Sequence, residues 1–209
     1  MVLTMTPTER TPESAPPGPT NPGGVRTLTE AKALSALAHP VRSRIMDALK
    51  VDGPSTASTL ATRIAQNVGN VSHHLKVLAE GGLVVEAPEL AKDRRERWWR
   101  LANAGTRWTR ADFADDAAAV AAAQAAEALA LHRQIARVHE WMARSEEDPA
   151  WDDAAFATQN WLRLSQDELR ELSEEIVEVL MRWGSREIPD DGAERESVLV
   201  FSRGFPSKP

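Results

Sequence analysis

Residues 71–78 read VSHHLKVL, and their apolar positions recur at helical spacing. Val71, Leu75 and Leu78 are separated by four and then three residues, which places them on one face of a helix. Gly81 and Gly82 follow, and glycine readily takes the backbone conformation that ends a helix. The sequence therefore predicts a helix over 68–81 with an apolar inner face and a polar outer face.

Three shorter helical patterns precede this helix. Thr27 and Glu30 form a capping-box pattern, which predicts that ordered sequence begins near Thr27. The second pattern starts at 39–40, because proline is well tolerated at a first helical position. Thr56 is expected to cap the third pattern, and residues 67–70 are expected to form a turn around Gly69.

Two strand patterns follow the helix over 68–81. Residues 83–85 and 97–101 are rich in Val, Leu and Trp, and the charged segment 86–96 joins them. This order of helices, turn, helix and hairpin predicts a winged helix-turn-helix over 27–104. The expected fold class is mainly α with a small β wing, that is, α+β.

The two flanking regions have different compositions. Residues 1–26 are rich in proline and poor in large apolar residues, so we expect a disordered tail. Residues 105–209 are expected to form a dimerisation domain, with effector binding as an alternative left open, and with a small α/β region at its end. Its first part, about 112–144, lacks Gly and Pro and predicts one long helix. Four apolar residues on that helix repeat at spacings of four, three and four, as in a helix-pairing seam: Leu131, Ile135, Val138 and Met142.

A second capping box, Ser165 with Glu168, predicts a further helix that Gly184 closes. This helix carries a seam of its own: Leu169, Leu172, Ile176, Val179 and Trp183. The flanking segments 156–164 and 197–205 are short and rich in Val, Leu, Phe and Trp, which predicts strands that can pair with each other.

The charge is distributed unevenly along the chain. The whole chain has a formal net charge of −6, but residues 26–110 hold 14 Lys and Arg against 8 Asp and Glu, a net of +6. A positive module on an acidic chain suits a protein that approaches phosphates with one face. The chain has no cysteine, which excludes disulfides, thiol nucleophiles and thiolate metal sites. No run approaches the roughly 18 apolar residues of a membrane span, and no signal-peptide pattern is seen, so a cytoplasmic protein without a membrane partner is expected.

Several short motifs resemble the ArsR-type (arsenic-repressor-like) bacterial regulators. They lie in the same order as in that family, at residues 36–42 (ALAHPVR), 60–61, 71–78 and 82–84. The resemblance covers about residues 28–102. It implies a winged helix-turn-helix regulator of transcription, with repression as the expected mode. The seam of the long helix predicts a homodimer, and the twofold axis of that homodimer predicts an inverted-repeat operator.

The expected contacts with DNA fall into two groups. The polar face of the helix over 68–81 is expected to read bases in the major groove, through Asn70, Ser72, His73 and Lys76. The wing and the start of the second helix are expected to contact phosphates or the minor groove, through Lys92, Arg94, Arg95 and Arg97 and through Arg42 and Arg44. The alternative for each group is an ordinary solvated face. For His74, at the edge of the apolar stripe, packing or a phosphate contact is favoured over base readout.

Other functions remain open to different degrees. A metal sensor would need ligands such as His132, His139 and Glu140, which include no close ligand pair, so no metal site and no cofactor is predicted. An apolar small-molecule effector could bind among Trp141, Trp161 and Trp183, although aromatic residues at helical spacing are more often core. No enzyme is predicted, since no phosphate-binding glycine loop or catalytic triad is present. A winged-helix module that binds protein instead of DNA is a further alternative, which the basic wing argues against.

Overall fold

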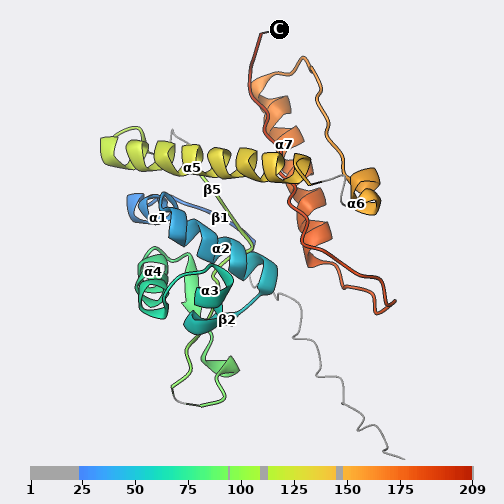
Figure 1. Ribbon diagram of the computed structural model, residues 1–209. Coiled ribbons are helices and arrows are strands. Elements are labelled where there is room, and N and C mark those ends of the chain that lie inside the picture. Colours follow the sequence, from blue (N-terminus) through green and yellow to red (C-terminus); the bar gives the residue numbers. More distant parts are fainter. Residues whose placement is uncertain (1–23, 94, 109–112, 145–147, 209) are drawn as a thin grey trace, which may run out of the picture.

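The computed structural model describes residues 24–93, 95–108, 113–144 and 148–208 (Figure 1). It is mainly helical with two small sheets, as the sequence predicts. The helices are α1 (Ala31–Leu37), α2 (Pro40–Asp52), α3 (Ala57–Arg63), α4 (Val68–Glu80), α5 (Ala117–Met142), α6 (Pro149–Ala154) and α7 (Gln166–Ser185). The strands are β1 (Val25–Thr27), β2 (Ser55–Thr56), β3 (Val84–Glu86), β4 (Trp98–Leu101) and β5 (Gly105–Arg107).

Side-chain caps set the starts of α2, α3 and α4. His39 Nδ1 accepts a hydrogen bond from Val41 N at 3.2 Å, with Pro40 at the first helical position, and Thr56 Oγ1 accepts one from Thr59 N at 3.2 Å. Asn67 Oδ1 accepts one from Asn70 N at 2.7 Å, so α4 begins at Val68. The predicted starts at 39–40 and Thr56 are therefore confirmed. The predicted turn over 67–70 is wrong, because the Asn67 cap places Gly69 and Asn70 in the first turn of α4.

The predicted capping box at Thr27 and Glu30 is wrong. Thr27 lies in β1, which pairs in parallel with β5, and Leu28 N donates to Arg107 O at 2.8 Å. Glu30 precedes α1 but makes no side-chain capping bond. The chain is held at this point by pairing with a distant strand and by burial of Leu28, which is 0% exposed. A local pattern such as a capping box cannot reveal such a long-range partner.

The predicted hairpin is confirmed. β3 and β4 are antiparallel, with Val84 opposite Leu101 and Glu86 opposite Trp99. A 3₁₀ helix over Pro88–Leu90 lies in the loop between them. β2 pairs with the other edge of β4, with Ser55 opposite Trp99. This third strand, only two residues long, was not predicted, and it attaches the wing to the start of α3.

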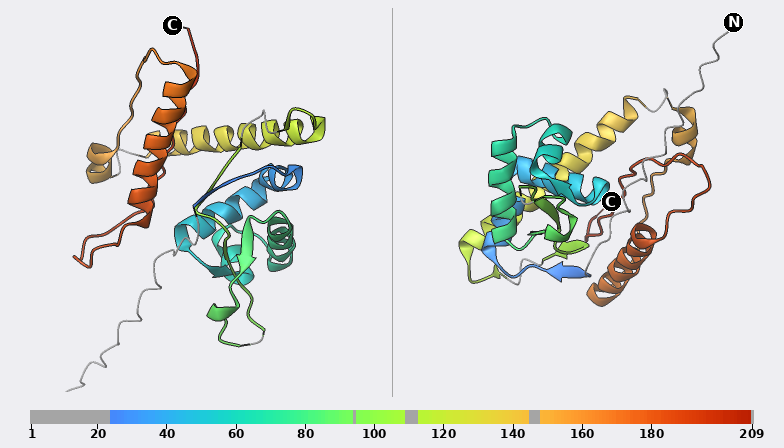
Figure 2. Two further views of the ribbon diagram at one scale, coloured as in Figure 1. Left: turned by 180° about the vertical axis from the view of Figure 1, so that it is seen from behind. Right: turned by 90° about the horizontal axis from the view of Figure 1, so that it is seen from below.

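α5 lies over α1, on the side away from the wing hairpin (Figures 1 and 2). Its inner face is made of small side chains, and Ala119, Ala123 and Ala126 are at most 4% exposed. Small residues let two helices approach closely, so α5 shares one core with Leu34 and Ile45 of the N-terminal helices. The long helix is shorter than predicted, because Asp116 caps it through the backbone N–H groups of Ala118 and Ala119.

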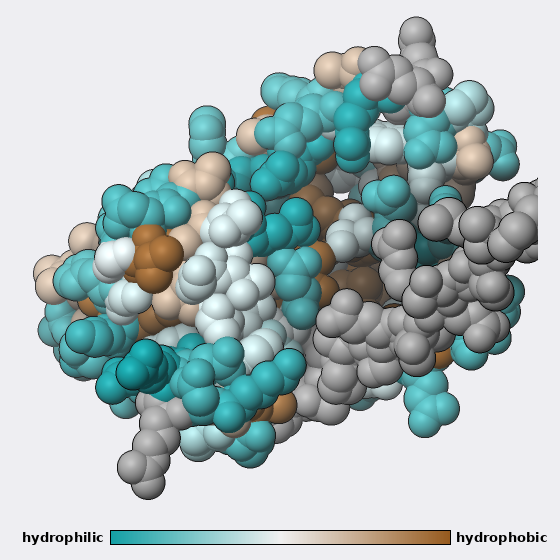
Figure 3. All heavy atoms as spheres, turned by 60° about the horizontal axis from the view of Figure 1, so that its bottom comes forward, coloured by the Kyte–Doolittle hydropathy of each residue, from teal (hydrophilic) through white to brown (hydrophobic). Residues whose placement is uncertain are grey.

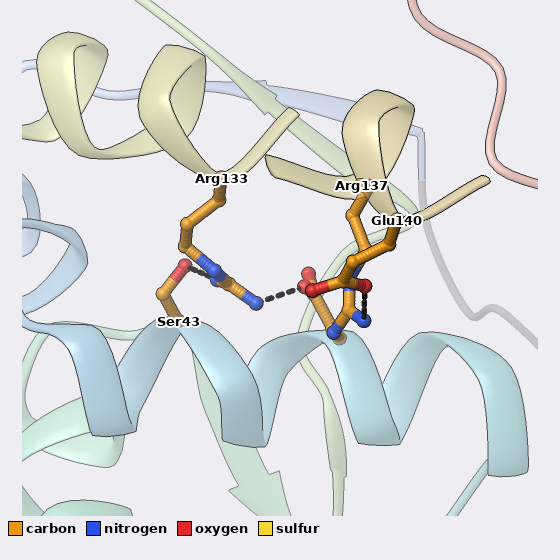
Figure 4. Close-up of polar contacts among 5 residues, drawn as sticks. Ser43, Arg133, Arg137 and Glu140 are labelled. Atoms are coloured by element: carbon orange, nitrogen blue, oxygen red, sulfur yellow. Dashed lines mark hydrogen bonds and ion pairs between the residues drawn. The ribbon is translucent and has the colours of Figure 1, made fainter. Parts of the chain in front are cut away.

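Arg133 ties the second half of α5 to α2. Its guanidinium donates to Ser43 Oγ and, at 2.6 Å, to Asp47 Oδ2, and its side chain is 20% exposed. Figure 4 shows Arg133 extending from α5 to Ser43 on α2, whereas Arg137 pairs with Glu140 of its own helix. Two arginines one turn apart therefore have different surroundings.

This difference gives a matched test of stability. We expect Arg133→Ala to lower the free energy of unfolding by about 1–2 kcal/mol, because it removes charge-assisted hydrogen bonds between two helices. Arg137→Ala should cost at most about 0.5 kcal/mol, since exposed ion pairs within a helix contribute little. Urea titration of both variants measures the difference. Equal losses of stability would show that the bridge to α2 adds nothing.

α7 begins as predicted and is followed by extended chain. Ser165 N donates to Glu168 Oε2 at 2.6 Å and Glu168 N donates to Ser165 Oγ at 3.3 Å, so the capping box is confirmed. These bonds lower the pKa of Glu168. The helix ends at Ser185, one residue beyond Gly184.

The predicted strands at 156–164 and 197–205 are wrong for the single chain, since neither described segment forms a strand. Both are extended, but a strand also requires a hydrogen-bonded neighbour, and the two segments do not pair. Arg203 instead donates to Gln134 Oε1 of α5 at 2.9 Å. Within the described part of the chain, every helix is too short or too polar to cross a membrane.

Candidate nucleic-acid interface

The two faces of α4 differ as the sequence predicts. Val71, Leu75 and Leu78 are each 0% exposed and pack into the core of the N-terminal unit. Of the four residues predicted to read bases, His73 and Lys76 are exposed, and Asn70 and Ser72 are half-buried. The structure therefore brings these four onto one short helix, outside the core. Together they offer an amide, a hydroxyl, an imidazole and an ammonium group.

Asn70 is oriented by its neighbours. Its Nδ2 donates to Gln66 Oε1 at 2.9 Å, and its backbone N–H is taken by the Asn67 cap. Its carboxamide oxygen makes no hydrogen bond with a described residue. A side chain that is held in place loses less conformational freedom when it binds, which favours a specific contact.

His74 is buried and packs against the start of α2. It is 7% exposed, and its ring centroid lies 4.5 Å from that of His39, the residue that caps α2. Its Nδ1 has no hydrogen-bond partner among the described residues. Burial lowers the pKa of His74, and the positive charges of His39, Arg42 and His73 add to the effect. Burial and the charge of Arg42 also lower the pKa of His39. The position is that of a packing residue, which sequence reasoning favoured.

The two lowered pKa values predict acid sensitivity. A histidine whose pKa is lower in the folded state than in the unfolded chain binds fewer protons when folded, so stability is full above pH of about 6.5 and falls below it. Below a pH of about 6.5, we therefore expect unfolding to be accompanied by proton binding at His74, by at most about one proton per chain. His74→Gln should flatten the dependence of the unfolding free energy on pH.

The control for this experiment is His73→Gln, which removes an exposed imidazole from the adjacent position. Urea titrations at a series of pH values give both slopes. If the His73 variant flattened the profile and the His74 variant did not, the buried ring would not be the titrating group.

Arg42 and Arg44 support the ends of helices. Arg42 donates to Ala36 O at 2.7 Å and to Ser35 O at 2.9 Å, in the last turn of α1. Arg44 donates to Ile64 O at 2.5 Å, just after α3. Cationic donors stabilise the carbonyl groups that a helix leaves unpaired at its C-terminus. Sequence reasoning missed this role, because the partners lie on neighbouring helices.

The wing loop is shaped by its acidic residues. Asp93 Oδ1 accepts hydrogen bonds from Arg95 N at 2.6 Å and Glu96 N at 3.2 Å. Glu96 Oε2 accepts from Lys92 N at 3.0 Å and from Trp98 Nε1 at 3.2 Å. The carboxylates therefore hold the backbone of the loop, while the side chains of Lys92 and Arg95 stay exposed.

The remaining wing cations differ from this pair. Arg97 is exposed and lies 3.7 Å from the carboxylate of Glu86. Arg100 pairs with Glu89. Arg94 lies outside the described residues. Among the predicted phosphate contacts of the described wing, Lys92 and Arg95 are thus the cations whose side chains form no ion pair with a described residue.

The residues predicted for the dimer seam form an exposed stripe on α5. Leu131, Ile135 and Val138 are 39%, 45% and 39% exposed, and Met142 is 69% exposed. Large apolar residues at helical spacing lose favourable free energy when they face water. The stripe lies on a different face of α5 from the alanines that pack on α1.

The predicted effector residues are not enclosed. Trp161 and Trp183 are each 61% exposed, with Arg186 lying 4.9 Å from the Trp183 ring, and Trp141 is half-buried beside Arg144. Two hollows of the described structure lie at the wing loop and on α7, and none of these three indoles lines either of them. No group of three or more His, Asp or Glu side chains in the described ranges is placed to hold a metal ion.

Residues 37–87 match a family model described as a helix-turn-helix domain. The chain contains a winged helix-turn-helix domain. The match covers α2, α3, α4 and β3, and the β3–β4 hairpin supplies the wing. The winged helix-turn-helix fold that the sequence predicted is therefore confirmed. No match was found among curated proteins.

Three solved structures are similar to about half of the chain. One is the homodimeric winged helix-turn-helix DNA-binding domain of a possible ArsR-family regulator from Mycobacterium bovis, with 23% identity over 55% of this chain and 83% of that one, at a TM-score of 0.33. Another is a crystal structure of a possible transcriptional regulatory protein fragment from Mycobacterium bovis, with 23% identity, coverage of 52% and 91%, and a TM-score of 0.33. The third is a possible transcriptional regulator for arsenical resistance, with 28% identity, coverage of 51% and 95%, and a TM-score of 0.30.

Proposed function

We propose that this protein is a sequence-specific DNA-binding regulator of transcription, acting as a repressor and not as an enzyme. The observation that carries the proposal is the outer face of α4, where His73 and Lys76 are exposed and Asn70 is held in place by Gln66. In a helix-turn-helix the second helix enters the major groove, where amide, imidazole and ammonium groups can tell base pairs apart.

The residues divide by the part of DNA that they contact. Asn70, Ser72, His73 and Lys76 are proposed to contact base edges. Lys92, Arg94, Arg95 and Arg97 are proposed to contact phosphates or the minor groove, with Lys92 and Arg95 strongest because acidic neighbours bind the loop's backbone and not these cations. Arg42 and Arg44 contribute less, because part of each guanidinium is already bound to carbonyl groups.

The regulator is proposed to act as a homodimer through the α5 stripe. A twofold axis between two copies of α5 would present two copies of α4 to one face of DNA, which predicts an inverted-repeat operator with half-sites about 10 base pairs apart. Action on DNA would place the protein in the cytoplasm.

A second candidate function is a response to an apolar small molecule, which the exposed indoles of Trp161 and Trp183 favour.

Selection of bound sequences from a random DNA pool tests the proposal directly. We expect an inverted repeat to be enriched and to bind at least about 10³-fold more tightly than a shuffled duplex at the same salt concentration. Fluorescence anisotropy with both duplexes measures the ratio. Equal affinity for both would contradict sequence-specific binding, and no affinity for either would favour a protein-binding module.

A further inference from the structure

The described C-terminal region exposes an unusual amount of apolar surface. In the described ranges 22 large apolar side chains are exposed, and fourteen of them belong to residues 156–205. Soluble proteins expose single apolar residues commonly, but large groups of them mark surfaces that another molecule covers. Figure 3 shows apolar side chains set back beside hydrophilic ones, near the middle of the face that lies at the bottom of Figure 1.

The backbone of this region is open as well. No backbone hydrogen bond joins either 156–164 or 197–205 to another described residue. Residues 198–201 read VLVF, a sequence with high strand propensity. An extended segment with unpaired N–H and C=O groups is a template for pairing with a further strand.

The apolar face of α7 adjoins this extended segment. Gly204 lies so close to the helix that an added Cβ would come within 3.1 Å of Leu169 Cδ1. Further along α7, Ile176, Val179 and Leu180 line a shallow apolar hollow, and Trp183 is 61% exposed. The helix and the extended segment therefore form two sides of one uncovered layer.

The surface area is larger than a compact monomer requires. The chain exposes 16249 Å². A compact protein of 22.9 kDa exposes about 9,600 Å². If the residues outside the described ranges exposed the area of an extended chain, they would add about 4,000 Å² to the compact value. The surface area that remains in excess is then about 2,600 Å². A standard interface covers about 800 Å² per partner, so the excess suits an extensive interface with a second protein chain.

We propose that a second copy of this chain covers this layer, by antiparallel pairing of its segment 197–205 with the same segment here. The inference rests on the proposed homodimer and identifies a second part of its interface. The hydrogen bond from Arg203 to Gln134 places this segment next to Leu131, Ile135 and Val138, so the two apolar surfaces adjoin. A twofold axis brings a segment next to its own copy in antiparallel orientation. If residue i then faces residue j of the copy, residue j also faces residue i of the copy.

Other occupants fit this surface less well. The solvent face of α7 carries Glu171, Glu174, Glu175 and Glu178, which would repel DNA phosphates. The hollow on α7 is shallow and open, whereas small-molecule sites bury most of their ligand.

The absence of cysteine permits a direct cross-linking test. Phe201→Cys places one thiol at the centre of the proposed paired strand, where a twofold axis sets the residue opposite its own copy, and Glu178→Cys places one on the polar side of α7 as the control. Under mild oxidation we expect most of the full-length Phe201 variant to become a disulfide-linked dimer, because opposed strand residues lie within disulfide distance. The control should remain mostly free. Equal cross-linking of both variants, or none of the Phe201 variant in a sample that sediments as a dimer, would overturn the proposal.

A second pair of variants measures the contribution of the strand. Val200 is 42% exposed in the single chain. Val200→Pro removes a backbone donor that the paired strand needs, whereas Val200→Thr keeps strand propensity. Sedimentation should show the dimer dissociation constant rising at least tenfold for the proline variant and less than threefold for the threonine variant.

The two proposals fail differently in these experiments. If the proline variant dimerises and binds the operator like the wild type, strand pairing is wrong and the DNA-binding function stands. If the wild type is monomeric at every concentration and binds no DNA, the proposed function fails too. Hydrogen exchange of amides 197–205 gives an independent check, since it should slow at least tenfold when wild-type protein is raised from below to above its dimer dissociation constant.

Discussion

We expect the double variant Leu131→Asp, Ile135→Asp to sediment as a monomer or to be recovered as insoluble protein. In the proposed dimer these two side chains are buried against the second copy, so the variant would place four carboxylates in an apolar seam. Burying an unpaired charge costs several kcal/mol, which exceeds what the remaining apolar contacts of the seam can offset. Its affinity for the inverted repeat should fall at least about 100-fold, because the two half-sites are no longer bound by one molecule.

Analytical ultracentrifugation measures the first effect and anisotropy the second. His132→Asp is the control, since this exposed residue lies beside Leu131 but outside the stripe. An unchanged dimer in the double variant would remove Leu131 and Ile135 from the interface. Dissociation of the control as well would show that α5 itself is disturbed by any added charge.

The second large effect concerns the division between base and phosphate contacts. His73→Ala should cost about 1–3 kcal/mol for each base interaction that it removes from the true operator complex, and little on random DNA, with the salt dependence nearly unchanged. Asn70→Ala should act similarly, with a further small decrease in stability because its bond to Gln66 is removed. Lys92→Ala or Arg95→Ala should weaken both kinds of DNA complex alike. Each should also reduce the slope of the logarithm of the binding constant against the logarithm of the salt concentration, by about one for every phosphate that a subunit no longer neutralises.

Anisotropy titrations at several salt concentrations separate these outcomes. If the wing variants changed sequence preference and the α4 variants changed only the salt slope, the assignment of helix to groove would be reversed. If no variant altered affinity for any DNA, the regulator would not bind DNA through these residues.

The sequence predicted those parts of the fold that depend on local chemistry. Val71, Leu75 and Leu78 identify the inner face of α4 because helical spacing alone decides which side chains share a face. The Ser165 capping box and the His39-Pro40 start are likewise short-range patterns, and both occur as predicted. The exposed outer face of α4 follows from the same periodicity.

Features that depend on distant partners could not be predicted in this way. Thr27 lies in a strand because residues 105–107 pair with it, about 80 positions along the chain. The carbonyl partners of the Arg42 and Arg44 guanidinium groups likewise lie on or beside neighbouring helices. The segments 156–164 and 197–205 have strand-like sequences without a strand partner in the same chain.

The alanine face of α5 joins the long helix to the helix-turn-helix unit. Ala119 and Ala123 belong to the same core as Leu34 and Ile45, so the long helix and the helix-turn-helix unit are packed together. In the proposed dimer, the angle at which two copies of α5 cross therefore fixes the distance between the two copies of α4. Substitutions on the outer stripe of α5 would then alter the preferred length of the spacer between half-sites, while substitutions on α4 would alter the half-site sequence. Spacer length and half-site identity are thus separable properties, set at opposite ends of the same unit.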